Sequence, residues 1–241
     1  MSKTVSKNAI EGMFSAGAHF AFSRSRRHPT VAPYIFGAKN KVEIFDLEKT
    51  NQLLEEAKVF IKNLGKEGKT VLFVGGKSEA RNAVKNGAQS LGMPFVDGRW
   101  IGGTLTNAVQ IRKRVEKLEK LTSEKEKGEL AKYTKKERLL IDREIANLER
   151  FFSGIVSMKD LPKALFVIDP RKEKNAVKEA LDMGVPVVAL AGSDCNIKEI
   201  SYPMVGNDAS QTSIQFFVNE ITKAYAEGQT EAKSMPAVPA E

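Results

Sequence analysis

A short glycine-lysine motif is the most direct candidate for chemistry in this chain. Gly75-Gly76-Lys77-Ser78 follows an apolar run, and a glycine-rich turn that ends in Lys-Ser resembles a loop that cradles nucleotide phosphates. Such a loop needs a further glycine five positions before the glycine that precedes the lysine, and that position is Val71. We therefore favour a plain strand-to-helix turn, with Ser78 as the helix cap. A nucleotide-binding enzyme using Gly75–Ser78, with Asp169 as its Mg²⁺ ligand, remains the alternative.

Metal-binding and nucleophilic residues form no recognisable site. The histidines, His19 and His28, are nine residues apart and Cys195 is distant, which matches no zinc spacing. Neither histidine can be assigned as a base for Ser193 or Cys195. We expect no metal, no cofactor, no catalytic residue and no small-molecule substrate, so the chain is not predicted to be an enzyme.

The strongest functional signal is a basic segment near the start of the chain, Ser23–Lys41, here called the basic arm. It contains no acidic residue, and its charged members are Arg24, Arg26, Arg27, Lys39 and Lys41. His28, Tyr34 and Phe36 could stack on bases or ribose. The whole chain carries a net charge of +8, which favours a polyanionic partner. We predict RNA contact for the arm over simple solvation.

Two further basic groups are weaker candidates for RNA binding. Arg99 precedes the only tryptophan, Trp100, in a glycine-rich turn, where burial of Trp100 as a loop anchor is favoured slightly over stacking. A second group lies at the start of a long charged segment and contains Arg112, Lys113, Arg114, Lys117 and Lys120. For this group phosphate contact and plain solvation are equally favoured, because mixed charges are typical of exposed helices.

The pattern of apolar residues predicts an α/β domain. Apolar runs without alternation occur at Val71–Val74, Ala164–Ile168 and Pro186–Ala191, and each precedes an amphipathic stretch. Such strands are typical of a parallel sheet covered on both faces. We predict a three-layer α/β/α architecture, preceded by a helix at about Val5–Ala16 and a β-hairpin around Gly37–Asn40.

One segment, Thr104–Phe152, interrupts this alternation. It has no strand signal, and two apolar stripes at helical spacing flank a polar link near Glu124–Gly128. Two such stripes predict an antiparallel coiled-coil hairpin, about 30 Å long at 1.5 Å per residue. We therefore expect an α/β RNA-binding domain formed by residues 1–103 and 153–227, a hairpin insertion at 104–152 and a disordered tail at 228–241.

The location suggested by the sequence is the cytoplasm. No apolar run is long enough to cross a bilayer, and the first residues lack the apolar stretch of a signal peptide. The single cysteine, Cys195, excludes an intramolecular disulfide and fits a reducing compartment. A membrane-surface protein recruited by the basic arm is the least favoured interpretation, because no amphipathic anchor accompanies the charge.

Several phrases of this chain resemble the bacterial ribosomal protein S-two family. They occur in the family's order over about residues 5–227, at positions 16–20, 32–37, 45–50, 72–75, 98–107, 161–173 and 205–208. The longest is the Leu161–Glu173 phrase, and two of its basic residues, Arg171 and Lys172, join the RNA-binding candidates. The order and number of these phrases make the resemblance specific.

The resemblance implies a flavodoxin-like domain with an inserted coiled-coil hairpin. It also implies binding to small-subunit ribosomal RNA, a place in the bacterial small ribosomal subunit, and contact with neighbouring proteins, including the large first ribosomal protein. This chain departs from the family at Phe22, where relatives have a second histidine, and at Gly192, Asn196 and Lys198, where aspartate is common. These departures argue against a metal site here.

Overall fold

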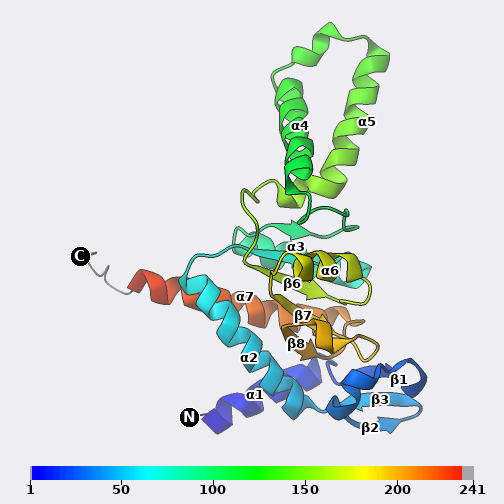
Figure 1. The fold of residues 1–241 in the computed structure, drawn as a ribbon, viewed down its shortest axis with the longest axis vertical. Helices are drawn as coiled ribbons and strands as arrows, with labels where there is room; N and C mark the ends of the chain where they lie inside the picture. Colours follow the sequence, from blue (N-terminus) through cyan, green and yellow to red (C-terminus); the bar gives the residue numbers. More distant parts are fainter. Residues whose placement is uncertain (1, 235–241) are drawn as a thin grey trace.

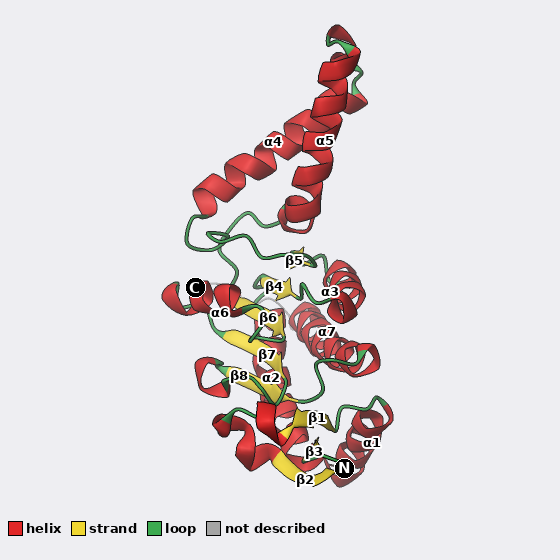
Figure 2. Ribbon diagram, turned by 90° about the vertical axis from the view of Figure 1, so that its right-hand side faces the viewer, coloured by secondary structure: helices red, strands yellow, loops and turns green. Residues whose placement is uncertain are grey.

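A five-stranded parallel sheet forms the centre of the molecule. The structure, a computed structural model, describes residues 2–234. The strands are β4 (Val71–Val74), β5 (Phe95–Val96), β6 (Ala164–Ile168), β7 (Val187–Ala191) and β8 (Tyr202–Val205). They pair in the order β5-β4-β6-β7-β8, and every pair is parallel. Figure 2 views this sheet with its strands one above another.

Both faces of this sheet are buried, which explains why its strands are apolar without alternation. Alternate side chains, such as Phe73 and Phe166, pack against α2 (Leu47–Lys66), α3 (Ser78–Ser90) and α7 (Gln211–Ser234). Their neighbours, such as Leu72 and Val167, face α6 (Lys174–Asp182) and the loops beside it. The α/β/α, flavodoxin-like fold predicted from the sequence is therefore confirmed.

A small antiparallel sheet lies beyond the β8 edge (Figure 1). It follows α1 (Ser2–Ser15) and contains β1 (Phe20–Ser23), β2 (Ile35–Lys39) and β3 (Val42–Phe45) in the order β1-β3-β2. The predicted hairpin is present, and its turn residues Asn40 and Lys41 both have positive φ, as the type I′ hairpin turn requires. The sequence analysis missed β1, whose four residues are short of a clear strand signal.

The basic arm is compact. Two 3₁₀ helices, η1 (Arg24–Arg26) and η2 (Pro29–Tyr34), connect β1 to β2. The backbone N–H of His28 donates to the carbonyl of Ser193, which follows β7. The arm is thus fastened to the end of the parallel sheet although 165 residues separate these two positions.

The predicted helical hairpin projects from the β5 side of the molecule (Figures 1 and 2). Its arms are α4 (Ala108–Glu126) and α5 (Lys135–Phe152), joined through the 3₁₀ helix η3 (Glu129–Lys132). The seam buries six apolar side chains: Ile111, Val115, Leu118, Ile145, Leu148 and Phe152. Leu105 and Phe152 belong to the same core as the sheet, so cuts at 104 and 152 would remove part of the domain's own core.

Two local predictions were wrong. Ser78 is not the cap of α3: Lys77 occupies that position, and the Ser78 hydroxyl donates to Glu79 instead. The final helix does not end near Ala226 but continues to Ser234, because Gly65 and Gly228 let α7 pack closely on α2. The expected disorder is therefore wrong for residues 228–234, and residues 235–241 lie outside the described part of the chain.

The remaining short helices are η4 (Ser153–Ile155), at the foot of the hairpin, and η5 (Ile197–Glu199), between β7 and β8. Within residues 2–234, no helix combines the length and the apolar character needed to span a membrane.

Candidate nucleic-acid interface

Most candidate residues lie on the loops that follow the parallel strands, here called the carboxyl edge. In chain order these strands form the 2-1-3-4-5 arrangement, whose ligand crevice lies between the first and third strands. Those strands are β4 and β6, so the crevice lies where Gly75–Lys77 faces Asp169–Glu173.

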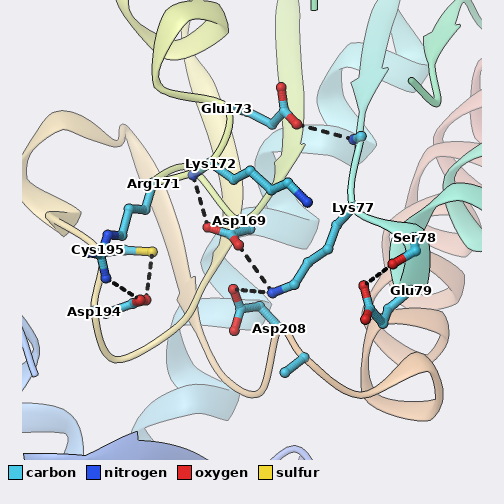
Figure 3. Close-up of polar contacts among 12 residues, drawn as sticks. Lys77, Ser78, Glu79, Asp169, Arg171, Lys172, Glu173, Asp194, Cys195 and Asp208 are labelled. Carbon is cyan, nitrogen blue, oxygen red and sulfur yellow. Dashed lines mark hydrogen bonds and ion pairs between the residues drawn. The ribbon is translucent and has the colours of Figure 1, made fainter. Parts of the chain in front are cut away.

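The centre of this crevice is occupied by an ion cluster (Figure 3). Lys77 Nζ lies 3.1 Å from Asp169 Oδ2 and 3.3 Å from Asp208 Oδ2. Burial favours the uncharged lysine, but the two carboxylates outweigh it and raise the pKa of Lys77. Burial, with repulsion from Asp169, raises the pKa of Asp208 to about 6. The lysine of the glycine-rich motif therefore neutralises acids within the protein.

The backbone of the same motif is also engaged. Gly76 N–H donates to Glu173 Oε1 at 3.3 Å, and burial raises the pKa of Glu173. A Cβ at position 76 would lie 2.3 Å from the carbonyl oxygen of Gly98, so glycine is needed for the two loops to meet. With Lys77 paired to acids and the Gly76 N–H facing a carboxylate, the nucleotide-binding alternative has no support.

The fold joins the basic arm to the loop after β6. Arg26 and Arg171, far apart in sequence, both pair with Asp194, at 3.6 Å and 2.5 Å; Figure 3 shows the Arg171 contact. The Asp194 side chain is 7% exposed, whereas those of Arg26 and Arg171 are more than half exposed. The Arg26 guanidinium also lies over the Phe22 ring, 4.3 Å from its centroid. One buried acid thus holds two outward-facing guanidinium groups together.

Three candidates of the basic arm have contacts within the protein. Arg27 Nη1 lies 2.8 Å from Oε1 of the buried Glu43. The His28 ring accepts from the Thr30 backbone N–H and caps η2. Tyr34 is half-buried against the core. These contacts give all three residues structural roles in the arm.

The other candidates of the arm face solvent. Arg24, Lys39 and Lys41 are exposed, and no ion pair involving them occurs among the described residues. Phe36, on β2, is 80% exposed. An exposed aromatic ring on a basic hairpin can stack on an unpaired base.

Arg99 and Lys172 line a common pocket at the carboxyl edge. The pocket has a volume of about 380 Å³ and also contacts Arg81, Trp100, Glu173 and Asn175. Trp100 is 5% exposed, which favours the loop-anchor interpretation over stacking. Arg81, on α3, escaped the sequence analysis because an isolated arginine on a helix carries no distinctive signal.

Glu179 on α6 anchors the glycine-rich loop of this pocket. Its Oε1 accepts from the Trp100 indole N–H at 2.9 Å and from Gly103 N–H at 2.8 Å, and its Oε2 accepts from Leu105 N–H at 3.0 Å and from both donors of Thr106. Burial opposes the charge, but these hydrogen bonds outweigh it and lower the pKa of Glu179. No sequence signal marks this residue, because its partners lie more than 70 positions away.

Arg112, Lys113 and Arg114 form a separate group on α4, and all three are exposed. Arg112 lines a groove at the foot of the hairpin that also contains Glu116, Glu119 and Asp160. Its surroundings are therefore mixed in charge, unlike those of Arg171 or Lys172.

No group of three or more His, Cys, Asp or Glu side chains in the described part of the chain is arranged to hold a metal ion. Cys195 is 1% exposed, and burial raises the pKa of its thiol. This thiol is therefore inert as a nucleophile at neutral pH.

Comparison with known proteins gives a consistent result. Residues 13–228 match the family model described as ribosomal protein S2. The chain is 40% identical to the small ribosomal subunit protein uS2 of a Nitratiruptor species over 220 residues, which is 91% of this chain and 82% of that protein. For the proteins of the same name from Sulfurimonas denitrificans and Coprothermobacter proteolyticus the identities are 42% and 38%, over 91% of this chain and 85% and 82% of theirs.

Proposed function

This chain belongs to the ribosomal protein S2 family, and from that premise we propose which of its surfaces bind RNA. As a member of this family it is a structural constituent of the small ribosomal subunit, functions in translation on the cytoplasmic ribosome, and is not an enzyme. We propose that the exposed side of the basic arm and the adjoining carboxyl edge of the sheet bind small-subunit ribosomal RNA.

The convergence of Arg26 and Arg171 on Asp194 is the observation that carries this proposal. A single buried acid cannot neutralise two guanidinium groups, so the cluster keeps a net positive charge. Arg24 adds a third cation on the same arm. Guanidinium groups held in a fixed position suit bidentate contact with phosphate. Phe36, on β2 of the small antiparallel sheet, offers a stacking surface.

The candidate residues differ in how far contacts within the protein already hold their side chains. The proposed phosphate contacts are the exposed cations Arg24, Arg26, Lys39, Lys41, Arg99, Arg171 and Lys172. Arg27, His28 and Tyr34 shape the arm, and their effect on RNA binding follows from the fold of that segment. Arg112, Lys113 and Arg114 are a second, independent contact at the foot of the hairpin.

Replacing Arg24, Arg26 and Arg171 together by glutamine tests the proposal. Binding to a small-subunit ribosomal RNA transcript, measured by fluorescence anisotropy across a salt series, should weaken, and the log–log salt slope should flatten by up to about three contacts at about 0.7–0.9 each. The control replaces Lys85, Lys163 and Lys178 by glutamine, which removes the same charge from exposed lysines elsewhere. Equal affinity and slope in both variants would refute the assignment.

We also propose that the α/β domain folds without the outer part of the hairpin. Lys117 and Glu144 form an ion pair across the two arms, so a short Gly-Ser linker can replace residues 118–143 and retain most of the buried base. The shortened chain should melt cooperatively within a few degrees of the full chain. A molten or insoluble product would show that the hairpin belongs to the folding unit.

Neighbouring small-subunit proteins, the large first protein among them, are the remaining proposed partners. We propose that the chain supports their docking on the assembled subunit. Small subunits prepared without this chain should then recover less of the first protein on sucrose gradients, and adding the chain back should restore it. Unchanged recovery would remove that partner.

A further inference from the structure

Three cations from separate elements line the pocket beside Trp100. Arg81 lies on α3, Arg99 follows β5, and Lys172 follows β6. All three are exposed, and among the described residues none of them has a carboxylate within ion-pair distance. Gathering like charges raises the local positive potential, so this cluster is arranged unfavourably unless an anion completes it.

The acid in the pocket does not neutralise this cluster. Glu173 lines the same pocket, but its carboxylate accepts the Gly76 N–H and is largely buried. One carboxylate against three cations leaves the pocket positive, even with Glu173 fully ionised. The Asn175 side chain adds a neutral amide to the wall, and amides bind phosphate oxygens without changing the charge.

The walls of the pocket are held in place before any ligand arrives. Trp100, next to Arg99, is fixed by its hydrogen bond to Glu179, and the loop that carries Gly76 packs against the Gly98 carbonyl without room for a side chain. Lys172 N–H donates to Asp169 Oδ1 at 3.1 Å, which fixes the start of its loop. Preorganised donors lose little entropy when they bind.

The position of the pocket indicates the kind of anion that it accepts. It flanks the crevice between β4 and β6, where ligands of this fold class bind, but the Lys77 cluster fills the centre of that crevice (Figure 3). A free nucleotide would need a site that encloses most of its surface, whereas the three cations here are open to solvent. A phosphate in the backbone of a longer chain can bind at such an open site, because only the phosphate group has to contact the three cations.

We propose that the Arg81–Arg99–Lys172 pocket binds one backbone phosphate of the small-subunit ribosomal RNA. This inference rests on the proposed function and adds to it a defined site, separate from the Arg26–Arg171 cluster. The ligand is a phosphodiester, and the two arginines and the lysine share it.

The test uses the full-length chain with Arg81, Arg99 and Lys172 replaced by glutamine. Its binding to a small-subunit ribosomal RNA transcript is measured by anisotropy at several salt concentrations, beside the charge-matched Lys85, Lys163 and Lys178 control. Affinity should fall about tenfold or more relative to the control. Because one phosphate is shared, the salt slope should flatten by about 0.7–0.9, one contact's worth, although three charges are lost.

A pocket variant that binds like the control would overturn the inference. If the Arg24, Arg26 and Arg171 variant is weakened at the same time, the proposed function stands and only this pocket is lost. If the unaltered chain does not bind the transcript, both fail. A slope that flattens by about three contacts would also overturn the shared site, because each cation would then have its own phosphate.

A second measurement separates RNA from a free phosphate ligand. Isothermal titration of the unaltered chain with inorganic phosphate and with adenosine monophosphate should detect no binding tighter than about 1 mM, a free energy of about −4.1 kcal/mol. Tighter binding that the pocket substitutions abolish would identify a small-molecule site and replace the RNA inference. Circular dichroism of each variant verifies the fold, which should persist because all substituted side chains are exposed.

Discussion

Two groups of basic side chains lie close together at the carboxyl edge, and only one of them is paired with carboxylates. Lys77 is 15% exposed and touches two carboxylates. Arg81, Arg99 and Lys172 are exposed, and no carboxylate among the described residues lies within ion-pair distance of them. A buried charge requires a partner, whereas an exposed one is solvated at little cost. The same strand ends therefore produce a structural ion cluster and, beside it, exposed cations for which we propose RNA binding.

Removing Lys77 should give the largest loss of stability. Lys77→Ala leaves Asp169 and Asp208 facing each other without a counter-charge, and breaking a buried pair in this way costs about 3–5 kcal/mol. Urea unfolding followed by circular dichroism measures the change. Lys85→Ala, on the exposed side of α3, should change the stability by no more than about 0.5 kcal/mol. A Lys77 variant as stable as its control would abolish the distinction between the two groups.

Glu179 tests whether buried hydrogen bonds hold the wall of the Arg81–Arg99–Lys172 pocket in place. Glu179→Gln removes the charge and turns an amide N–H toward backbone donors, so we expect a loss of about 2–3 kcal/mol. Trp100 is the only tryptophan, and its fluorescence should shift to the red as the loop loosens. Glu56→Gln, on an exposed face of α2, is the control. An unshifted spectrum with unchanged stability would remove Glu179 as the anchor.

The basic arm allows the same comparison, because Arg27 is paired with a buried acid and Arg24 is exposed. Arg27→Gln leaves Glu43, 3% exposed at its side chain, without its cation, and the expected loss is about 1–3 kcal/mol. Arg24→Gln should leave the melting temperature unchanged and weaken RNA binding. Thermal melts and anisotropy of both variants give the result. The reverse pattern would mean that Arg27, and not Arg24, faces the RNA.

The pH dependence of stability gives the smallest change per step, at most about 1.4 kcal/mol for each pH unit. Burial raises the pKa of Asp208 from 3.8 to about 6, so between about pH 4 and pH 6 the folded state binds this proton more readily than the unfolded chain. The contribution of Asp208 to the unfolding free energy therefore falls as pH rises through this window. Asp208→Asn should remove that part of the slope in urea titrations at each pH. Identical slopes in both proteins would contradict the raised pKa.

Local signals in the sequence were sufficient for the main elements of the fold. The apolar runs at Val71–Val74 and Ala164–Ile168 became central strands with the bounds expected, because a strand buried on both faces needs an apolar residue at every position. The apolar stripes containing Ile111 and Ile145 formed the buried seam of the helical hairpin, because a helix that is buried along one side needs apolar residues at helical spacing. Elements held mainly by distant contacts were harder to predict: β1 was missed, and α7 was ended too early because its close packing on α2 is not a local property.

The proposed RNA-binding residues show the same difference between local properties of the sequence and contacts made by distant residues. The sequence by itself determined that the chain is basic, that the arm lacks acids, and that Val71 breaks the phosphate-loop pattern. Only the tertiary structure decided that Arg27 pairs with Glu43, that Arg26 and Arg171 meet at Asp194, and that Arg81 joins Arg99 and Lys172. Charge is a property of each residue and can be counted along a chain. Whether a charge is buried, paired or free depends on which distant acid the fold brings within about 4 Å of it.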